Sequence, residues 1–259
     1  MLNVAVIGTG NISPAHIKAY LEFPERCRIV ALCDIYPEKA EAKKKDFHID
    51  GAKVYASHKD IIKDDIKIDL VSVCTPPFTH AQIAIDFLEA GVNVIVEKPM
   101  AASLHECDQM LEAERRSGKM LAVIAQNRFT DSYMKLKSVL DSGVIGRVLH
   151  AQVNSYWWRG HCYYDLWWRG AWATEGGGCT LNHAVHHIDM LGWMLGTPEK
   201  VTAVLSNAAH DNAEVEDISV AAMQYPGGTL AQVTSSVIHH GEEQEVIYVT
   251  QDVVDARPY

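Results

Sequence analysis

The strongest constraint on the fold is an alternation, along the first 122 residues, between short apolar runs and longer stretches with helical periodicity. Runs this apolar are typical of strands buried on both faces, as in parallel sheets covered by helices on each side. The pattern predicts strands over 2–7, 28–33, 52–55, 69–74, 92–96 and 120–125, and helices over 14–22, 37–46, 58–62, 79–90 and 103–117. We therefore expect an α/β fold with a doubly wound parallel sheet.

The pattern changes after Phe129. It predicts a helix over 132–141, a strand over 148–156, an aromatic, glycine-rich loop and a helix over about 180–195. Only strand-like runs follow, over 200–207, 217–225, 229–238 and 245–250, and Pro226-Gly227-Gly228 is typical of a hairpin turn. The sequence thus predicts two domains, residues 1–122 and residues 123–259, the second of α+β class with an open, mostly antiparallel sheet.

Composition excludes several classes of function. The 259 residues carry a formal net charge of −10, and no lysine or arginine cluster could neutralise the phosphates of a nucleic acid. No apolar run approaches the roughly twenty residues that span a bilayer, and the N-terminus enters a strand without a secretory signal. The six cysteines are scattered without a C-x-x-C pair, which predicts reduced thiols and a cytoplasmic location.

A glycine turn joins the first predicted strand to the first predicted helix, in the segment Gly8-Thr9-Gly10-Asn11-Ile12-Ser13. The first glycine allows a tight turn, and the second lets backbone N–H groups approach a pyrophosphate at the helix N-terminus. Ser13 stands where the motif usually has Gly or Ala, but it is small enough for close packing. We expect a Rossmann domain in which Gly8, Gly10, Asn11 and Ile12 contact a dinucleotide; a tight turn without a ligand is the alternative.

Asp34 follows the second predicted strand. A carboxylate at this position accepts hydrogen bonds from ribose hydroxyls and repels a 2′-phosphate. The next residues, Ile35 and Tyr36, include no arginine that would attract that phosphate. The sequence therefore favours NAD over NADP.

Two further turns follow predicted strands. Thr75-Pro76-Pro77 ends the fourth strand, and Glu97-Lys98-Pro99 ends the fifth. Ligands of doubly wound sheets lie at the carboxyl ends of strands, so Thr75 and Pro76 should border the cofactor. His80, one helical turn later, is either a further cofactor contact or an ordinary residue of the helix N-terminus.

The order of these motifs resembles the glucose–fructose oxidoreductase, inositol dehydrogenase and rhizopine-catabolism (Gfo/Idh/MocA) family. The resemblance covers nearly the whole chain. It implies an NAD(P)-binding first domain and a second domain whose exposed sheet face forms oligomers, here a homodimer or homotetramer. Family members usually continue beyond this length, so either the sequence is incomplete at its C-terminus or the second domain is cut short. The motifs are Gly8–Ser13, Thr75-Pro76-Pro77 with His80, Glu97-Lys98-Pro99, and Gly176-Gly177-Gly178 with Asn182, His186 and Asp189.

The resemblance also implies roles for individual residues. Lys98 corresponds to the catalytic lysine, and Glu97 and Lys98 flank the nicotinamide ribose. His186 corresponds to the catalytic histidine, and Asn127, within Gln126-Asn127-Arg128, lines the cofactor. Asn182 stands where many members carry an aspartate. Since asparagine cannot take a proton, we expect His186 to act alone or with Lys98 while Asn182 positions a substrate hydroxyl.

On one continuous helix, Asn182, His186 and Asp189 share a face at spacings of four and three residues. Asp189 then either orients His186 or caps a neighbouring loop. His183 and His187 point away from His186 and fit no zinc spacing, so we expect no metal site.

Trp157-Trp158-Arg159-Gly160 recurs as Trp167-Trp168-Arg169-Gly170. Aromatic faces stack on the apolar face of a sugar ring, and arginine donates to its hydroxyls, so Trp168 and Arg169 are candidate substrate residues. The alternative is an aromatic loop that covers the sheet or fills a subunit interface.

Together these features predict an NAD-dependent oxidoreductase acting on a secondary hydroxyl or keto carbon of a carbohydrate, polyol or glycoside. Three alternatives remain: an NAD-using glycosidase with transient oxidation, a non-catalytic nucleotide or sugar sensor, and a metal-dependent hydrolase.

Overall fold

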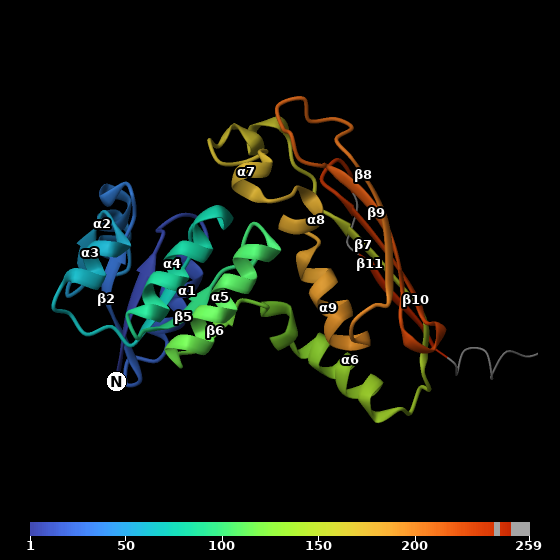
Figure 1. Ribbon diagram of the computed structural model, residues 1–259, viewed down its shortest axis with the longest axis horizontal. Coiled ribbons are helices and arrows are strands. Elements are labelled where there is room, and N and C mark those ends of the chain that lie inside the picture. Colours follow the sequence, from blue (N-terminus) through green and yellow to red (C-terminus); the bar gives the residue numbers. More distant parts are fainter. Residues whose placement is uncertain (241–243, 250–259) are drawn as a thin grey trace, which may run out of the picture. The chain divides into compact units, whose positions relative to one another are not determined.

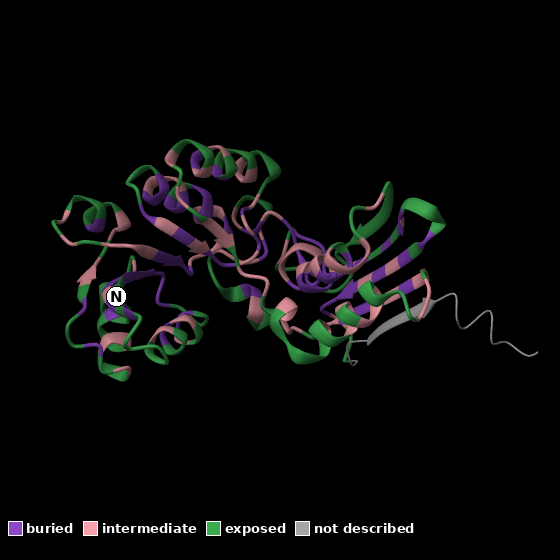
Figure 2. Ribbon diagram, turned by 90° about the horizontal axis from the view of Figure 1, so that it is seen from below, coloured by how far each residue is buried: buried purple, intermediate pink, exposed green. Residues whose placement is uncertain are grey.

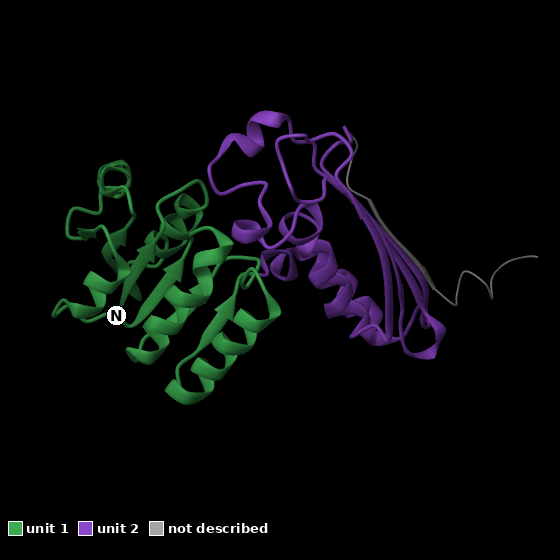
Figure 3. Ribbon diagram, turned by 45° about the horizontal axis from the view of Figure 1, so that its top comes forward, with its two compact units in different colours: residues 1–124 green, residues 125–259 purple. Residues whose placement is uncertain are grey.

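The computed structural model describes residues 1–240 and 244–249. The chain forms two compact units, Met1–Ile124 and Ala125–Tyr259, which Figure 3 colours separately. We call them unit 1 and unit 2. The domain boundary predicted from the sequence lies two residues earlier, after residue 122. Within the described residues, no helix has the length and apolar character needed to cross a bilayer.

Unit 1 is a six-stranded parallel sheet in the order β3-β2-β1-β4-β5-β6 (Figure 1). This is the strand order of a dinucleotide-binding doubly wound fold, so the predicted fold class is confirmed. The strands are β1 (Leu2–Ile7), β2 (Cys27–Cys33), β3 (Lys53–Tyr55), β4 (Leu70–Val73), β5 (Asn93–Val96) and β6 (Leu121–Val123). The helices are α1 (Ser13–Leu21), α2 (Pro37–Asp46), α3 (His58–Lys63), α4 (Pro77–Glu89) and α5 (Leu104–Ser117).

Helices cover both faces of this sheet, which explains why its strands are almost wholly apolar. Alternate residues of β1 pack on opposite sides: Ile7 joins a core formed with α3, α4 and α5, whereas Val6 joins a core that contains Ile17 of α1. Ser72 is the polar exception in β4, and it is fully buried.

Unit 2 contains a five-stranded sheet in the order β11-β7-β10-β9-β8, in which β7 and β10 run parallel and the other neighbours run antiparallel. The strands are β7 (Val148–Tyr156), β8 (Lys200–Ser206), β9 (Ile218–Gln224), β10 (Leu230–Ser236) and β11 (Gln244–Val249). The 3₁₀ segment η3 (Pro226–Gly228) joins β9 to β10, which confirms the predicted hairpin turn. Residue 250, the last of the predicted final strand, lies outside the described residues.

The remaining elements of unit 2 are helical. They are η1 (Gln126–Phe129), α6 (Asp131–Ser142), η2 (His161–Asp165), α7 (Trp172–Glu175), α8 (Cys179–Asn182) and α9 (Val185–Leu195). Leu191 of α9 packs on the sheet with Val153 of β7 and Val233 of β10. The buried and exposed residues that alternate along β9 show that one face of this sheet forms the core (Figure 2).

The prediction of one continuous helix over about 180–195 is wrong. It is divided into α8 and α9, because the chain turns at His183 and Ala184. The N–H of Ala184 donates to the carbonyl of Cys179, five residues back, at 2.9 Å, so the usual i to i−4 ladder is interrupted there.

Candidate functional site

Four strands of unit 1 end on one row of the sheet. Ile7 of β1 lies opposite Cys33 of β2 and Val73 of β4, and Val73 lies opposite Val96 of β5. Since the strands are parallel, the residues after them emerge at the same edge. Those residues are Asp34, Gly8, Cys74 and Glu97.

The turn after β1 has the geometry that a dinucleotide site requires. Gly8 has a φ of +87°, and a Cβ there would lie 2.7 Å from the carbonyl oxygen of Cys74, so only glycine fits. At Gly10, which is exposed, a Cβ would meet no atom within 4 Å, so the backbone is open to a ligand. The buried Ser13 donates its hydroxyl to the Gly10 carbonyl at 2.8 Å, which closes the turn onto α1.

Asn11 and Ile12 lie exposed at the start of α1, beside the open backbone of Gly10. Backbone N–H groups at such a helix start attract anionic groups. The residues present therefore fit the pyrophosphate of a dinucleotide.

Asp34 is held beside this turn by three hydrogen bonds. One carboxylate oxygen accepts from the Thr9 backbone N–H at 2.8 Å and from the Thr9 hydroxyl at 2.9 Å. The other accepts from the Tyr36 N–H at 3.0 Å. The oxygen that accepts only from the Tyr36 N–H keeps acceptor capacity for a ribose hydroxyl. Thr9, whose side chain orients the carboxylate, was not identified from the sequence, although it stands between the two motif glycines.

Thr75 and Pro76 lie half-buried after β4, whereas the side chain of His80 is 1% exposed. Its two ring nitrogens lie 2.7 Å from the Thr75 carbonyl and 2.9 Å from the Pro99 carbonyl. Burial lowers the pKa of His80, so the ring is neutral and donates to one of these carbonyls at a time. His80 thus ties the turn after β4 to the turn after β5, and its contact with a cofactor stays one of the two roles predicted for it.

Glu97 is buried, and Lys98 beside it is half-buried. One Glu97 oxygen accepts from His16 Nε2 at 2.9 Å, and the other accepts from the Lys98 N–H at 3.0 Å. Burial raises the pKa of Glu97, but the hydrogen bonds from His16 and the Lys98 N–H, together with the charge of Lys98, outweigh burial and leave the pKa below its ordinary value. Glu97 is therefore an ionised carboxylate at the end of β5.

In unit 2, the break between α8 and α9 separates two predicted site residues. Asn182 ends α8, and its side-chain amide donates to the Gly177 carbonyl at 2.6 Å. His186 lies in the first turn of α9. The single continuous helix on which Asn182, His186 and Asp189 were predicted to share a face is therefore not formed, because the chain turns at His183 and Ala184.

His186 is buried and lies against an aromatic side chain. The Trp157 ring stacks on His186 at 6.2 Å and meets the ring of His183 edge-on at 5.6 Å. His183 Nε2 lies 3.3 Å from the Tyr163 hydroxyl. His187 is also buried, and burial lowers its pKa. Trp157, from the aromatic loop, thus fixes the ring plane of the candidate catalytic histidine.

Asp189 does not orient His186, contrary to one of the two roles expected for it. Its two oxygens accept from Arg128 at 2.8 and 2.5 Å, a bidentate ion pair that joins α9 to η1. Asn127, also in η1, is half-buried, and its carbonyl accepts from the Thr130 N–H and hydroxyl. The ion pair therefore fixes the segment that carries the predicted cofactor residue Asn127.

Arg169 is enclosed by aromatic rings and a carboxylate. Its guanidinium carbon lies 3.9 Å from the ring centroid of Tyr163 and 4.2 Å from that of the half-buried Trp168. It donates to the Tyr163 hydroxyl and, at 3.1 Å, to Glu175. Glu175 also accepts from the Gly170 N–H at 2.6 Å, and burial raises its pKa above the ordinary value. These contacts hold Trp168 and Arg169 together, and their assignment as substrate residues stays a prediction.

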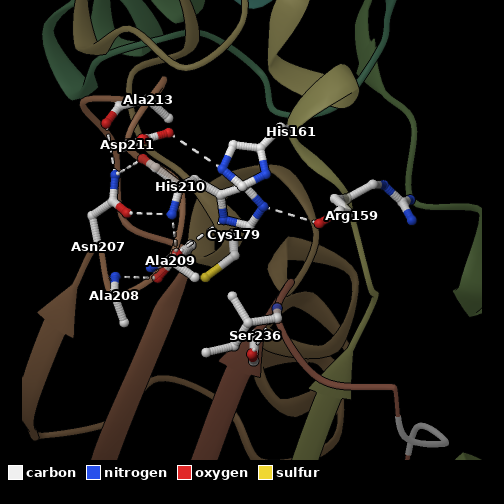
Figure 4. A network of polar contacts seen from close by, with 12 residues as sticks. Arg159, His161, Cys179, Asn207, Ala208, Ala209, His210, Asp211, Ala213 and Ser236 are labelled. Carbon is white, nitrogen blue, oxygen red and sulfur yellow. Dashed lines mark hydrogen bonds and ion pairs between the residues drawn. The ribbon is translucent and has the colours of Figure 1, made fainter.

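A second polar network in unit 2, shown in Figure 4, was not predicted from the sequence. His210 and Asp217 are both buried, and one Asp217 oxygen lies 2.9 Å from His210 Nδ1. His210 Nε2 lies 2.9 Å from the Arg159 carbonyl. The network thus anchors the aromatic loop to residues 207–217. Across the described part of the chain, no three His, Cys, Asp or Glu side chains converge as metal ligands would.

Two sequence profiles of one family match the chain. The profile described as "Oxidoreductase family, NAD-binding Rossmann fold" (GFO_IDH_MocA) matches residues 2–125. The profile described as "GFO/IDH/MocA C-terminal domain" matches residues 133–252.

Individual relatives agree. The chain is 34% identical over 203 residues to inositol 2-dehydrogenase 2 of Saccharopolyspora erythraea, covering 78% of this chain and 56% of the relative. It is 27% identical over 247 residues to 2,7-anhydro-N-acetylneuraminate hydratase of Mediterraneibacter gnavus, covering 94% of this chain and 63% of that relative. The chain thus spans little more than half the length of the curated relatives that it matches.

Among solved structures, the WlbA dehydrogenase of Bordetella pertussis, in complex with NADH and UDP-GlcNAcA, superposes with a TM-score of 0.89 at 31% identity. The match covers 95% of this chain and 70% of that protein.

Proposed function

Because this chain belongs to the Gfo/Idh/MocA family of oxidoreductases, we propose that it transfers a hydride between NAD and a carbohydrate. The reacting group is a secondary hydroxyl or keto carbon of a sugar, polyol or glycoside. The similar proteins support this class, since one is named an inositol dehydrogenase and another holds NADH with a sugar nucleotide.

The observation that carries the proposal is the common row on which four strands of unit 1 end. It places the open Gly8 turn, the Asp34 carboxylate and the Glu97-Lys98 turn at one sheet edge. An extended dinucleotide requires such a series: a pyrophosphate site, a ribose acceptor and polar groups for its second half. The choice of NAD rests on Asp34, whose charge opposes a 2′-phosphate.

Nicotinamide, when bound, supplies the acceptor or donor of the hydride. We assign stabilisation of the developing alkoxide to the Lys98 ammonium and proton transfer to the His186 imidazole, whose ring plane Trp157 fixes. Asn182, held by its bond to Gly177, positions a substrate hydroxyl. Trp168 offers an aromatic face to a sugar ring, and Arg169 is held beside it.

A substrate screen tests this function. The purified intact protein is incubated with NAD or NADP and a panel of polyols, neutral sugars, uronic acids and nucleotide sugars, and reduced nicotinamide is followed by absorbance. We expect turnover with NAD and at least one compound. No change in the amount of reduced coenzyme with any compound, whether the assay starts from NAD or from NADH, would rule out net oxidation or reduction.

A second candidate function is a reaction with transient oxidation and no net change in NAD. It is favoured by the similarity, over 94% of this chain, to a relative named as a hydratase. The NAD-using glycosidase considered above belongs to the same class. In this case a product forms while the amount of reduced coenzyme does not change. Mass spectrometry of the products therefore separates the two candidates.

We also propose a homo-oligomer. Val201, Val204 and Leu205 of β8 and Val220 of β9 are exposed by 55%, 73%, 49% and 49%. Apolar strand residues exposed in series are typical of an interface. Analytical ultracentrifugation should find a dimer or tetramer, and a monomer at micromolar concentration would contradict this.

A further inference from the structure

We propose that His16 is a positioning residue that fixes the Glu97 carboxylate for the ribose next to the nicotinamide. This inference rests on the proposed function, since it takes Glu97 and Lys98 to contact that half of NAD. No motif considered from the sequence includes His16, which lies in the middle of α1.

A chain of hydrogen bonds crosses the layer between α1 and the sheet. The Tyr20 hydroxyl lies 2.5 Å from the Ser72 hydroxyl, and Ser72 lies 3.3 Å from His16 Nδ1. His16 Nε2 lies 2.9 Å from Glu97, whose other oxygen accepts from the Lys98 N–H at 3.0 Å. Two residues of α1 and one of β4 thus lead to the carboxylate that follows β5.

The positions of the hydrogen atoms in this chain of hydrogen bonds can be assigned from its two ends, Glu97 and Tyr20. Glu97 is ionised and can only accept, so His16 Nε2 must carry a proton. Burial raises the pKa of Tyr20, so the phenol keeps its proton and can donate to Ser72. Ser72 can then donate to His16 Nδ1. In this assignment His16 is neutral, and each group donates once along a single direction.

The cost of this arrangement argues for a role beyond packing. Ile17, the next residue of α1, is fully buried in apolar surroundings, as are Val71 and Val73 on either side of Ser72. Apolar residues of similar volume stabilise such a layer as well as, or better than, a buried polar pair. What the polar pair adds is a fixed orientation of Glu97. The carboxylate still has acceptor sites to spare, as the binding of ribose hydroxyls requires.

Two variants that differ by one methylene group isolate this role. In His16→Gln, the amide nitrogen can reach the position of Nε2 and donate to Glu97. In His16→Asn, the amide is too short and can reach only toward Ser72. We expect His16→Asn to weaken NADH binding about tenfold, the usual worth of a hydrogen bond to a charged group, and His16→Gln to recover most of the loss.

Binding of ADP, measured by calorimetry on the same proteins, separates positioning from general damage. ADP lacks the nicotinamide ribose, so we expect its affinity to be unchanged in both variants. An equal loss of ADP and NADH affinity in His16→Asn would mean that His16 only holds α1 in place. Unchanged NADH affinity in His16→Asn would also overturn the inference.

The matched control is His58→Asn. His58 Nε2 contacts Asp86 at 2.8 Å, a comparable histidine–carboxylate pair between α3 and α4, and we expect this change to leave both affinities intact. If His16→Asn does not fold, Ser72→Ala removes the hydroxyl that lies 3.3 Å from His16 Nδ1 and leaves Glu97 unchanged, so it carries the test with the same readouts. Failure of the unchanged protein to bind NADH would remove the proposed function itself.

Discussion

Each unit of the molecule contains a buried histidine–carboxylate pair, and the two pairs differ at the second ring nitrogen. In unit 1, His16 contacts Glu97 and the hydroxyl of Ser72; in unit 2, His210 contacts Asp217 and the carbonyl of Arg159. A hydroxyl can donate or accept, whereas a carbonyl can only accept. His16 can therefore be neutral, but His210 satisfies both contacts only by donating from both ring nitrogens.

The two carboxylates also differ in the number of hydrogen bonds that they accept. Asp217 accepts from the N–H groups of Ala208, Ala209 and His210, at 2.8, 2.8 and 3.2 Å, as well as from the His210 ring. Among the residues that the structure describes, Glu97 accepts from His16 and from the Lys98 N–H. A carboxylate has about four acceptor sites. Four contacts within the fold use the acceptor sites of Asp217, whereas Glu97 keeps acceptor sites that a ligand can fill.

The largest expected effect concerns Lys98, whose N–H donates to Glu97. In Lys98→Met the ammonium to which we assign stabilisation of the alkoxide is lost, and we expect turnover to fall roughly a thousandfold. NADH should still bind, because the Lys98 N–H remains as a donor to Glu97 and the pyrophosphate and adenosine parts of the site are unchanged. Stopped-flow turnover and fluorescence titration of NADH measure the two quantities, and full turnover would contradict the assignment of Lys98.

In unit 2, Asp217→Asn should lower the free energy of unfolding by about 3 kcal/mol, since it leaves His210 and three backbone N–H groups without their charged partner. NADH affinity should not change, because Asp217 lies in unit 2 and outside the proposed nucleotide site. Urea titration measures the first quantity and fluorescence titration the second. A selective loss of NADH binding without destabilisation would reverse the comparison.

A substitution of Arg169 tests whether unit 2 binds the carbohydrate. Arg169→Met keeps an unbranched, apolar but shorter side chain and removes the charge between Tyr163 and Glu175. We expect the KM for the carbohydrate to rise about tenfold or more, with an unchanged affinity for NADH. Steady-state kinetics at saturating NAD give the KM, and an unaltered value would place the carbohydrate elsewhere.

Asp34→Ser should change coenzyme choice without large effects on stability. The carboxylate repels a 2′-phosphate, so its removal should shift the ratio of NAD to NADP efficiency about tenfold toward NADP. Comparison of kcat/KM for the two coenzymes checks this. The same ratio in variant and parent would show that Asp34 serves only Thr9 and Tyr36.

The smallest effect is a difference in acid stability. Burial raises the pKa of Asp217, but hydrogen bonds from Ala208 and His210 outweigh it and hold the pKa below the ordinary value. The stabilisation is therefore present above the unfolded value of about 3.9 and is lost as the pH falls through the lower folded value. We expect the free energy of unfolding of Asp217→Asn to fall less than that of the parent as the pH decreases from 6 to 3. Urea titrations across this range measure it, and an identical slope would contradict it.

Much of unit 1 could be predicted from the sequence, because local signals and tertiary structure agree there. Apolar runs gave the strands, glycines and prolines marked their ends, and parallel strands bring those ends to one edge. The hydrogen bonds that join side chains of α1 to Ser72 and Glu97 were not predicted. A signal existed: Ser72 is the polar residue of an apolar strand, and His16 and Tyr20 share a helix face with the buried Ile17.

Unit 2 was predicted less well, since its site depends on loops and on a helix break. The spacing of Asn182, His186 and Asp189 fits one helix, and no proline marks the turn at His183. The partners of Asp189 and Asp217 lie 61 and 7 residues away, in irregular segments whose course periodicity does not describe. Chemistry in such segments follows from three-dimensional contacts rather than from pattern.

The parallel pairing of β7 with β10 has a consequence for how such proteins diverge. All of the candidate carbohydrate residues in unit 2, from Trp168 to His186, lie in the excursion that leaves β7 and returns at β8. One contiguous stretch of sequence therefore holds these residues, so a change confined to it would alter the proposed carbohydrate contacts and leave the strands that form the core of the unit intact.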